Sequence, residues 1–327
     1  MIGPWHCGMQ FLEHFESRLK PSRIGLGCMT FGKTWDGQTP VAELLPRGRA
    51  ALEAAVESGI NFFDHADIYC RGRSEEVFAA AVTDLGLQRE SLWIQGKVGI
   101  RPGFGFDFSH AHIVEAVEGC LKRLETGYLD SLLLHRPDAL MEPEEVARAF
   151  EDLEQSGKVR HFGVSNQTAG QMALLRQFVK QPLRFNQVEL SLLHTQMLDE
   201  GVDFNRDIDE VNPTRQHGCL DYCRLHGITP QPWGPLAKGK LSGRESPDDN
   251  DRIQGAREKV TEMAAKYDVP NEAVVVGWLL RHPGRFQPLI GTTGPERIRN
   301  AAQAAGLELS REDWYALWVA GRGRRLP

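Results

Sequence analysis

Cysteine, long apolar runs and concentrated positive charge are all scarce in this sequence. Six cysteines are scattered through 327 residues with no Cys-x-x-Cys pair, which favours reduced thiols in a cytoplasm over a disulfide framework. The longest apolar run, residues 273–280, is too short to cross a bilayer. Residues 1–10 lack the basic region and apolar core of a signal peptide. We therefore expect a cytoplasmic protein with no membrane partner.

Charges of both signs are mixed along the chain. The 38 basic and 44 acidic residues give a formal net charge of −6, and no basic stripe follows a predicted helix. We interpret the one basic cluster, at residues 322–325, as a solvated terminus. Nucleic acid is therefore not an expected partner. No feature of the sequence indicates an oligomeric state.

Short apolar segments alternate with helical patterns along the whole chain. We expect buried strands at residues 23–29, 60–63, 91–97, 129–135, 159–165, 183–190, 228–233 and 286–290. We expect helices at residues 47–58, 74–85, 109–124, 144–155, 168–179, 213–225, 257–267, 272–281, 295–304 and 311–319. An N-terminal hairpin is expected at residues 10–20, and an acidic loop at residues 197–212.

Eight strands that each precede a helix predict an α/β fold, a (β/α)8 TIM barrel with an extra C-terminal helix. The alternative is an open, doubly wound sheet, which usually carries Gly-x-Gly-x-x-Gly after its first strand if it binds a dinucleotide. Residues 25–30 read GLGCMT, so the third glycine is missing and the barrel is preferred. No domain boundary or repeat is evident, and we expect one domain over residues 1–327.

Ionisable side chains follow three neighbouring strands of the predicted barrel, at the ends where such folds place their active sites. Asp64 ends the second strand, Lys97 the third and His135 the fourth. Tyr69 lies in the loop after Asp64, so the four side chains should converge. Separately, Asp64 and Lys97 could form a structural ion pair, and His135 could be an ordinary interior histidine. Their joint placement favours catalysis.

At these residues the chain resembles the aldo-keto reductase family. The matching motifs occur in the family's order: Asp64-x-x-x-x-Tyr69, Gln95-Gly96-Lys97, residues 132–138 (LLLHRPD), residues 163–166 (GVSN), Asn186-Gln187, residues 233–236 (WGPL) and residues 291–297 (GTTGPER). The resemblance covers essentially the whole chain. It implies a (β/α)8 barrel and reversible, nicotinamide-dependent reduction of aldehydes and ketones.

Carbonyl reduction needs a hydride donor at the carbon and a proton donor at the oxygen. A free tyrosine has a pKa of about 10 and is a reluctant acid at neutral pH. A cation beside it stabilises the phenolate and lowers that pKa. We expect Tyr69 to donate the proton, Lys97 and Asp64 to tune its pKa, and His135 to orient the carbonyl oxygen.

Further strand ends suit a nicotinamide cofactor. Ser165, Asn166 and Gln187 offer donors and acceptors for its carboxamide, and Trp233 offers a flat face for its ring. The next loop is expected to wrap a pyrophosphate with backbone N–H groups and two lysines. Its contributing residues are Gly234, Leu236, Lys238 and Gly239. The loop nearly matches an NTPase phosphate loop, but a proline at 235 and a leucine at 241 exclude that function.

Thr293 and Arg297 lie at the start of the helix after the last strand, a position that favours anions. Arg297 matches the arginine that contacts the adenosine 2′-phosphate in the family, so NADPH is preferred. Gly294 and Ala301 stand where many members carry a lysine and an Asn or Gln. NADH is therefore retained as a possible cofactor.

Two other classes of function fit parts of the sequence. A regulatory subunit would bind NADPH with little turnover, but it would not need four intact catalytic positions. A metal-dependent hydrolase would need clustered ligands, which Lys97 would repel; His110 and His112 diverge on their helix and are interpreted as surface residues. Trp35 and the aromatic residues at 104–108 could line a substrate pocket or pack an insertion.

Overall fold

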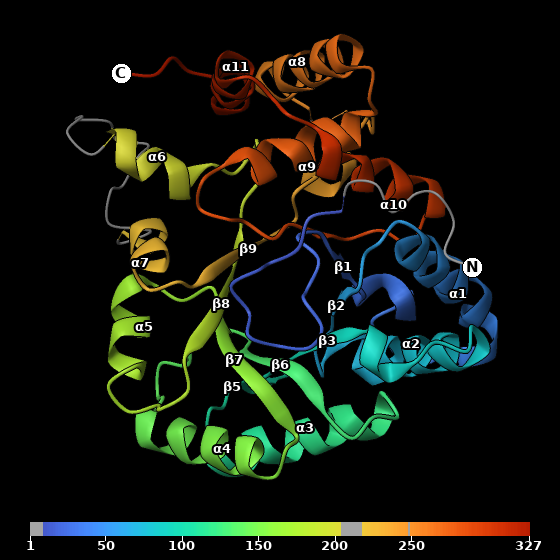
Figure 1. Cartoon of the computed structure of the whole chain (residues 1–327), viewed down its shortest axis with the longest axis vertical. Coiled ribbons are helices and arrows are strands. Elements are labelled where there is room, and N and C mark those ends of the chain that lie inside the picture. The colour runs from blue at the N-terminus through green and yellow to red at the C-terminus, as the bar shows by residue number, and fades with distance from the viewer. Residues whose placement is uncertain (1–8, 204–217, 248) are drawn as a thin grey trace.

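Eight short parallel strands close into a barrel in the order β1-β10-β9-β8-β7-β6-β3-β2 (Figure 1). A computed structural model describes residues 9–203, 218–247 and 249–327. The barrel strands are β1 (Gly25–Gly27), β2 (Phe62–Asp64), β3 (Trp93–Val98), β6 (Leu129–Leu134), β7 (Val159–Ser165), β8 (Leu183–Glu189), β9 (Thr229–Trp233) and β10 (Leu289–Ile290). Their closure confirms the predicted (β/α)8 TIM barrel.

Helices cover the outside of this barrel (Figure 1). They are α1 (Val41–Glu57), α2 (Arg73–Asp84), α3 (His110–Arg123), α4 (Pro143–Gln155), α5 (Ala169–Leu175), α6 (Gln196–Asp203), α7 (Cys219–Leu225), α8 (Asp251–Tyr267), α9 (Asn271–Arg281), α10 (Pro295–Ala302) and α11 (Arg311–Arg322). Each amphipathic helix buries one apolar face; in α4 this face is Val146, Phe150 and Leu153. The extra C-terminal helix is confirmed as α11. Among the described residues, none of these helices has the length and apolarity needed to cross a membrane.

The N-terminal segment closes the amino-terminal end of the barrel (Figure 1, blue). Its two arms are joined by an antiparallel bridge between Phe11 and Ser22, so the predicted hairpin forms with one bridge in place of two regular strands. Phe15 is fully buried inside it. The Phe15 ring stacks on that of Phe185 with centroids 5.1 Å apart, and it meets the Trp93 ring edge-on at 5.3 Å. The hairpin therefore works as an apolar plug, which leaves the opposite mouth for polar groups.

Several helix boundaries differ from those predicted. α1 begins at Val41, six residues before the predicted start. Pro46, which directly precedes that predicted start, lies inside the helix and does not end it. α8 also begins six residues early, at Asp251, because the side chain of Asn250 accepts the N–H of Ile253 and caps it. α5 is shorter than predicted and ends at Leu175.

The predicted acidic loop and two short strands also differ from expectation. Residues 196–203 form α6, because buried Met197 and Leu198 give this acidic segment an apolar face. Residues 204–212 of that loop, and the start of the helix predicted from 213, lie outside the described residues. A small antiparallel pair, β4 (Ile100–Arg101) and β5 (Gly105–Phe106), follows β3 and was not predicted.

Candidate active site

Lys97 and Asp64 form a buried ion pair between β3 and β2. Lys97 Nζ lies 2.6 Å from Asp64 Oδ1 and donates to the carbonyl oxygen of His65 at 2.8 Å. The Lys97 side chain is 0% exposed and that of Asp64 is 4% exposed. Burial lowers the pKa of Lys97, but its interactions with Asp64 and, second, with Tyr69 outweigh this effect and raise that pKa overall. The amine is therefore held in its charged form.

Tyr69 reaches this ion pair from the loop after β2. Its ring centroid lies 5.0 Å from Lys97 Nζ, and the residue is 9% exposed. The N–H of Asp67 donates to the carbonyl oxygen of Lys97 at 3.0 Å, which ties this loop to the end of β3. Cys70 and Arg71 follow with φ values of 49° and 54°, a left-handed conformation that is strained for residues with a side chain. The strained turn holds Tyr69 over the ammonium group.

The pKa of Tyr69 responds to two opposing effects. Burial is the larger and raises the pKa above its ordinary value, whereas the charge and a hydrogen bond of Lys97 lower it. Lys97 thus acts in the predicted direction, but the net shift is upward, opposite to the one expected from the cation alone. The phenol is therefore protonated at neutral pH and is held beside a cation that would stabilise its phenolate.

His135 lies beside Tyr69 at the end of β6. The two ring centroids are 5.9 Å apart and the rings are nearly perpendicular, at 82°. The backbone N–H of His135 donates to the carbonyl oxygen of Val98 at 2.9 Å, so the carboxyl ends of β3 and β6 lie side by side. Burial, together with the charges of Lys97 and Arg136, lowers the pKa of His135 to about 2. The imidazole is therefore neutral. The structure brings all four predicted residues together at one mouth.

A chain of hydrogen bonds joins the ends of β7 and β9. The Nδ2 group of Asn166 donates to Ser165 Oγ at 2.8 Å, and Ser165 Oγ donates to the carbonyl oxygen of Gln187 at 3.0 Å. The indole N–H of Trp233 donates to Asn166 Oδ1 at 3.2 Å. These predicted cofactor residues therefore lie in one connected group. The side-chain orientation of Trp233 is set by Asn166.

Gln187 contacts Asp64 of the ion pair as well as Ser165. Its Nε2 group donates to Asp64 Oδ1 at 3.0 Å and to Gln231 Oε1 at 3.3 Å. A side-chain amide has two N–H donors, so both are committed inside the barrel. The prediction treated Gln187 as a source of donors and acceptors. In the structure, the carbonyl oxygen of its side chain is the group left to face a ligand.

The loop after β9 contains consecutive residues in the left-handed conformation. Ala237 and Lys238 have φ values of 47° and 59°, between Gly234 at 66° and Gly239 at 87°. Successive residues in such conformations turn backbone N–H groups toward one concave side, which suits a phosphate. Lys238 is exposed there, and half-buried Leu236 packs the loop against the core.

The two lysines expected from this loop have different surroundings. Lys240 Nζ lies 2.9 Å from Asp249 Oδ1, and Arg257 also pairs with Asp249. That two lysines hold the pyrophosphate stays a prediction, and a carboxylate close by in the sequence balances the charge of Lys240. Lys238 keeps the predicted position.

Thr293 lies in the loop between β10 and α10, and Arg297 lies in the first turn of α10. Thr293 is buried, and its Oγ1 accepts the Nε–H of Arg47 at 2.7 Å. Arg297 is exposed. Sequence reasoning missed Arg47, because it lies on α1, 246 positions away from Thr293. The start of α10 thus has two arginines from separate helices beside it, an arrangement that attracts anions.

Further side chains near the mouth come from three loops. Trp35 is 56% exposed, and its ring meets that of Tyr69 edge-on with centroids 6.4 Å apart. The guanidinium carbon of Arg136 lies 5.9 Å from the centroid of Trp233. The aromatic cluster at 104–108 divides: Phe108 is buried in the core, whereas Phe104 and Phe106 are exposed on the β4–β5 hairpin. Trp35 and the aromatic residues at 104–108 were considered from the sequence, whereas the contact between Arg136 and Trp233 was not predicted.

Comparison with known proteins decides the family. Residues 23–318 match the Aldo/keto reductase family. The chain belongs to this family. It is 35% identical over 296 residues to an uncharacterized oxidoreductase of Bacillus subtilis, covering 88% of this chain and 90% of that one. It is 33% identical over 282 residues to a 6-dehydroglucose reductase of Novosphingobium aromaticivorans, covering 84% and 86%.

Solved structures of other aldo-keto reductases share the barrel. The glycerol dehydrogenase from Gluconobacter oxydans gives a TM-score of 0.78 at 25% identity, covering 96% of this chain and 95% of that one. An aldo/keto reductase from Klebsiella pneumoniae in complex with NADP and acetate gives 0.72 at 25% identity, covering 95% and 93%. The protein is therefore an oxidoreductase of this family.

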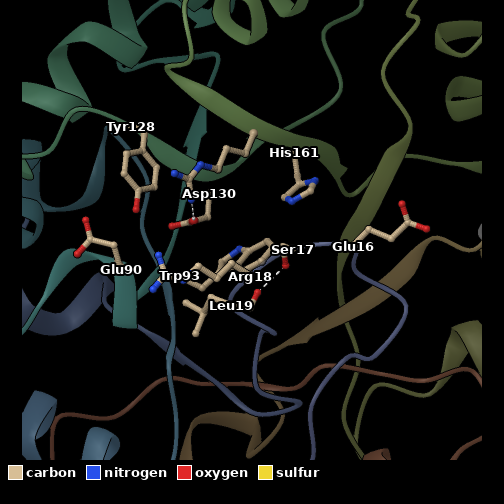
Figure 2. Close-up of a pocket in the computed structure, with 10 residues that line it drawn as sticks. Glu16, Ser17, Arg18, Leu19, Glu90, Trp93, Tyr128, Asp130 and His161 are labelled. Carbon is tan, nitrogen blue, oxygen red and sulfur yellow. Dashed lines mark hydrogen bonds and ion pairs between the residues drawn. The ribbon is translucent and has the colours of Figure 1, made fainter.

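At the opposite end of this aldo-keto reductase lies a pocket of about 410 Å3, between the N-terminal hairpin and the starts of three strands (Figure 2). The rings of Trp93 and His161 stack on its wall with centroids 5.2 Å apart. Asp130 is buried there and accepts from Arg89 Nη2 at 2.7 Å and from Arg160 Nη1 at 3.3 Å. The charge of Asp130 is thus paired within the protein, and the pocket is separate from the Lys97 mouth.

Two histidines outside the mouth, His110 and His65, lie in different surroundings. His110 Nε2 lies 2.6 Å from Asp152 Oδ2 on the surface between α3 and α4. Within the described parts of the chain, no three His, Cys, Asp or Glu side chains are grouped so as to hold a metal ion. His65 is fully buried, and burial with the charge of Lys97 lowers its pKa to about 3.

Proposed function

We propose that this aldo-keto reductase reduces aldehydes and ketones to alcohols with NADPH, and that Asp64, Tyr69, Lys97 and His135 are its catalytic residues. The observation that supports this most is the position of the buried Lys97 ammonium, 2.6 Å from Asp64 Oδ1 and 5.0 Å from the centroid of the Tyr69 ring. NADPH, when bound, supplies the hydride that reaches the carbonyl carbon.

Tyr69 is the proton donor in this proposal. Its phenol is protonated at neutral pH because burial raises its pKa, so the proton is available when the carbonyl oxygen gains charge. Lys97 then stabilises the phenolate that remains, and Asp64 keeps the ammonium in place. In the reverse direction the phenolate takes the proton from an alcohol.

His135 orients the carbonyl oxygen in this proposal. Its Nδ1 is buried and has no hydrogen-bond partner within the described chain. An unpaired acceptor is tolerated better than an unpaired N–H donor, so we assign the proton of the neutral ring to Nε2. The Nε2–H group then donates to the same oxygen that receives the proton of Tyr69.

The cofactor is held in this proposal by the groups at the remaining strand ends. Ser165, Asn166 and the side-chain carbonyl oxygen of Gln187 would bind the carboxamide, and Trp233 would offer its flat face to the nicotinamide ring. The loop with Gly234, Leu236, Lys238 and Gly239 receives the pyrophosphate. Thr293, Arg297 and the newly found Arg47 receive the 2′-phosphate, and NADPH is therefore preferred over NADH. Arg297→Ala should raise the KM for NADPH and leave that for NADH unchanged.

The test of the proposed function follows the oxidation of NADPH by the purified protein. Its panel contains aromatic aldehydes, a quinone and polyhydroxylated aldehydes; the last are included because relatives are named 6-dehydroglucose reductase and glycerol dehydrogenase. Tyr69→Phe should lower kcat by about 10²- to 10⁴-fold. Tyr315→Phe, on the outer helix α11, is the matched control and should retain full activity.

Two results would count against this function. Equal turnover by the wild type and Tyr69→Phe would remove the catalytic assignment. Tight NADPH binding without turnover of any carbonyl compound in the panel would favour the alternative of a regulatory subunit. Both measurements use the same protein and cofactor.

A cytoplasmic location is also proposed. The five described cysteines, at positions 28, 70, 120, 219 and 223, are all free and buried. Free thiols are usual in proteins of a reducing compartment. Fractionation of the source cells tests this proposal, and recovery of the protein outside the cytoplasm would contradict it.

A further inference from the structure

Four buried glutamines form a hydrogen-bonded cluster inside the barrel, below Asp64. They come from different strands or strand approaches: Gln95 from β3, Gln187 from β8, Gln231 from β9, and Gln287 from the segment just before β10. Barrel interiors are usually filled by branched apolar side chains. Burying an amide is costly unless its donors and acceptors are paired, so each polar group in this cluster needs a partner.

Gln231 is the centre of the cluster. Its Oε1 accepts from Gln95 Nε2 at 2.9 Å and from Gln187 Nε2 at 3.3 Å. The second N–H of each of these two amides donates to Asp64 Oδ1, at 2.8 Å from Gln95 and 3.0 Å from Gln187. Asp64 Oδ1, which also accepts from Lys97, is thus reached by three donors. Gln231 itself touches neither Asp64 nor Lys97 in this network.

The direction of every amide is set by two groups that only accept hydrogen bonds. At one end, the carbonyl oxygen of Ser22 accepts from Gln287 Nε2 at 2.6 Å. This leaves Gln287 Oε1 to accept from Gln231 Nε2 at 2.8 Å. Gln231 must then turn its own Oε1 toward Gln95 and Gln187, whose N–H groups meet the carboxylate of Asp64 at the other end. Reversing any one amide would place two acceptors against each other.

From this arrangement we infer that Gln231 is a positioning residue for Asp64. It orients the amides of Gln95 and Gln187 so that their N–H groups hold Asp64 Oδ1 against the ammonium of Lys97. The inference rests on the proposed function and extends it, because it assigns a role in catalysis to a side chain two hydrogen bonds away from the carboxylate of Asp64. Gln287, which donates to the carbonyl oxygen of Ser22, fixes the orientation of the Gln231 amide from the other side.

The rival interpretation is that these glutamines only fill the core. Under that interpretation, the loss of the Gln231 amide lowers stability but affects catalysis no more than any other core change. Under the positioning role, Gln231→Met frees Gln95 and Gln187 to turn, and the carboxylate of Asp64 loses its fixed position. The two interpretations differ in whether the effect of Gln231 passes through Asp64.

A double-mutant cycle measures this dependence. Gln231→Met should lower kcat about tenfold in the wild-type background, within the range of coupling between residues in one network. It should leave the KM for the carbonyl compound within twofold. In the Asp64→Ala background the same change should lower kcat by less than twofold, because the carboxylate to be positioned is already absent. Equal fold losses in the two backgrounds would overturn the inference.

The matched control is Gln181→Met. Gln181 is also buried, but its Nε2 donates to Glu154 Oε2 at 2.8 Å on the outside of the barrel. We expect this variant to keep its kcat in both backgrounds. A loss of kcat equal to that of Gln231→Met would show that any buried amide gives the effect, which would also overturn the inference.

The same cycle run on urea unfolding needs no turnover. If Gln231 restrains Asp64, the unfolding midpoint of the double variant falls by less than the sum of the two single shifts. Additive shifts would show that the two residues are not linked. A wild-type protein without reductase activity would refute the proposed function, and the unfolding cycle would still decide the link between Gln231 and Asp64.

Discussion

Asn166 Oδ1 accepts the indole N–H of Trp233 at 3.2 Å, and this bond joins the end of β7 to the end of β9. The Nδ2 group of the same residue donates to Ser165 Oγ at 2.8 Å. Asn166 has a φ of 56°, a left-handed conformation that asparagine adopts more readily than most residues. One side chain therefore fixes two of the groups proposed to hold the nicotinamide.

Asn166→Ala should weaken NADPH binding. It removes two hydrogen bonds worth roughly 1 kcal/mol each, so we expect the dissociation constant to rise about tenfold or more. Asn166→Asp keeps the acceptor for Trp233 and should lose less affinity. Asn166→Gly removes the side chain without the backbone strain that alanine has at this φ. Isothermal titration with NADPH compares the three, and unchanged binding by Asn166→Ala would show that Trp233 needs no such restraint.

Lys97→Met should change the pH dependence of the reaction. Reduction uses the protonated phenol, so its rate is maintained below the pKa of Tyr69 and lost as pH rises through it. Lys97 lowers that pKa against the effect of burial, so its removal raises the pKa further and moves the alkaline limb to higher pH. We also expect kcat to fall by about 10²-fold or more, because the phenolate loses its cation.

The pH–rate profile of kcat with saturating NADPH checks this prediction. Lys122→Met, at an exposed position on α3, is the control and should leave both the limb and kcat unchanged. If the limb of Lys97→Met moves to lower pH, Lys97 is not what lowers the pKa of Tyr69.

Much of the barrel follows from local patterns that a sequence carries. Strands such as Leu129–Leu134 are short and rich in leucine, and the alternation of strands and helices limits the topology to a few folds. The boundaries of α1 and α8 were missed because they depend on tolerance of Pro46 and on a cap from Asn250. The plug made by Phe15 was missed because its partners lie far away in the sequence.

The candidate site likewise has residues that the sequence predicts and residues that it does not. Asp64, Lys97 and His135 follow from one rule, that strand ends of a barrel share a mouth. The roles of Arg47 and Gln231 depend on contacts across 246 and 136 positions, respectively, and no spacing pattern signals them. The upward shift of the pKa of Tyr69 depends on its depth of burial, which a motif does not describe.

Asp67→Asn should make stability less dependent on pH. Burial and the neighbouring carboxylate of Glu75 raise the pKa of Asp67 from 3.8 to about 7, and its shielded Oδ1 has no partner in the described chain. Because the pKa is higher in the folded protein than in the unfolded one, this group stabilises the fold fully below pH 3.8 and loses that contribution as pH rises to about 7. The asparagine variant lacks this loss.

Urea unfolding at pH 5 and pH 8 measures the difference. We expect Asp67→Asn to be more stable relative to the wild type at pH 8 than at pH 5, by about 1–3 kcal/mol. Asp221→Asn, at a position whose side chain is 76% exposed, is the control and should change by less than about 0.5 kcal/mol at either pH. A constant difference between Asp67→Asn and wild type would mean that Asp67 does not titrate in this range.

Phe15→Ala should destabilise the fold while sparing the chemistry. Phe15 is fully buried and contacts the rings of Phe185 and Trp93 at the amino-terminal end of the barrel, so its loss leaves a cavity and costs about 3–5 kcal/mol. The proposed catalytic groups lie at the opposite, carboxyl-terminal end, so kcat should stay within twofold at a temperature where the variant is folded. Phe11→Ala is the matched control: Phe11 is 38% exposed on the same hairpin, and its removal should cost less than about 1 kcal/mol. Urea unfolding and NADPH oxidation on the same samples separate the two effects, and a fall in kcat that accompanies the loss of stability would show that the plug also shapes the distant mouth.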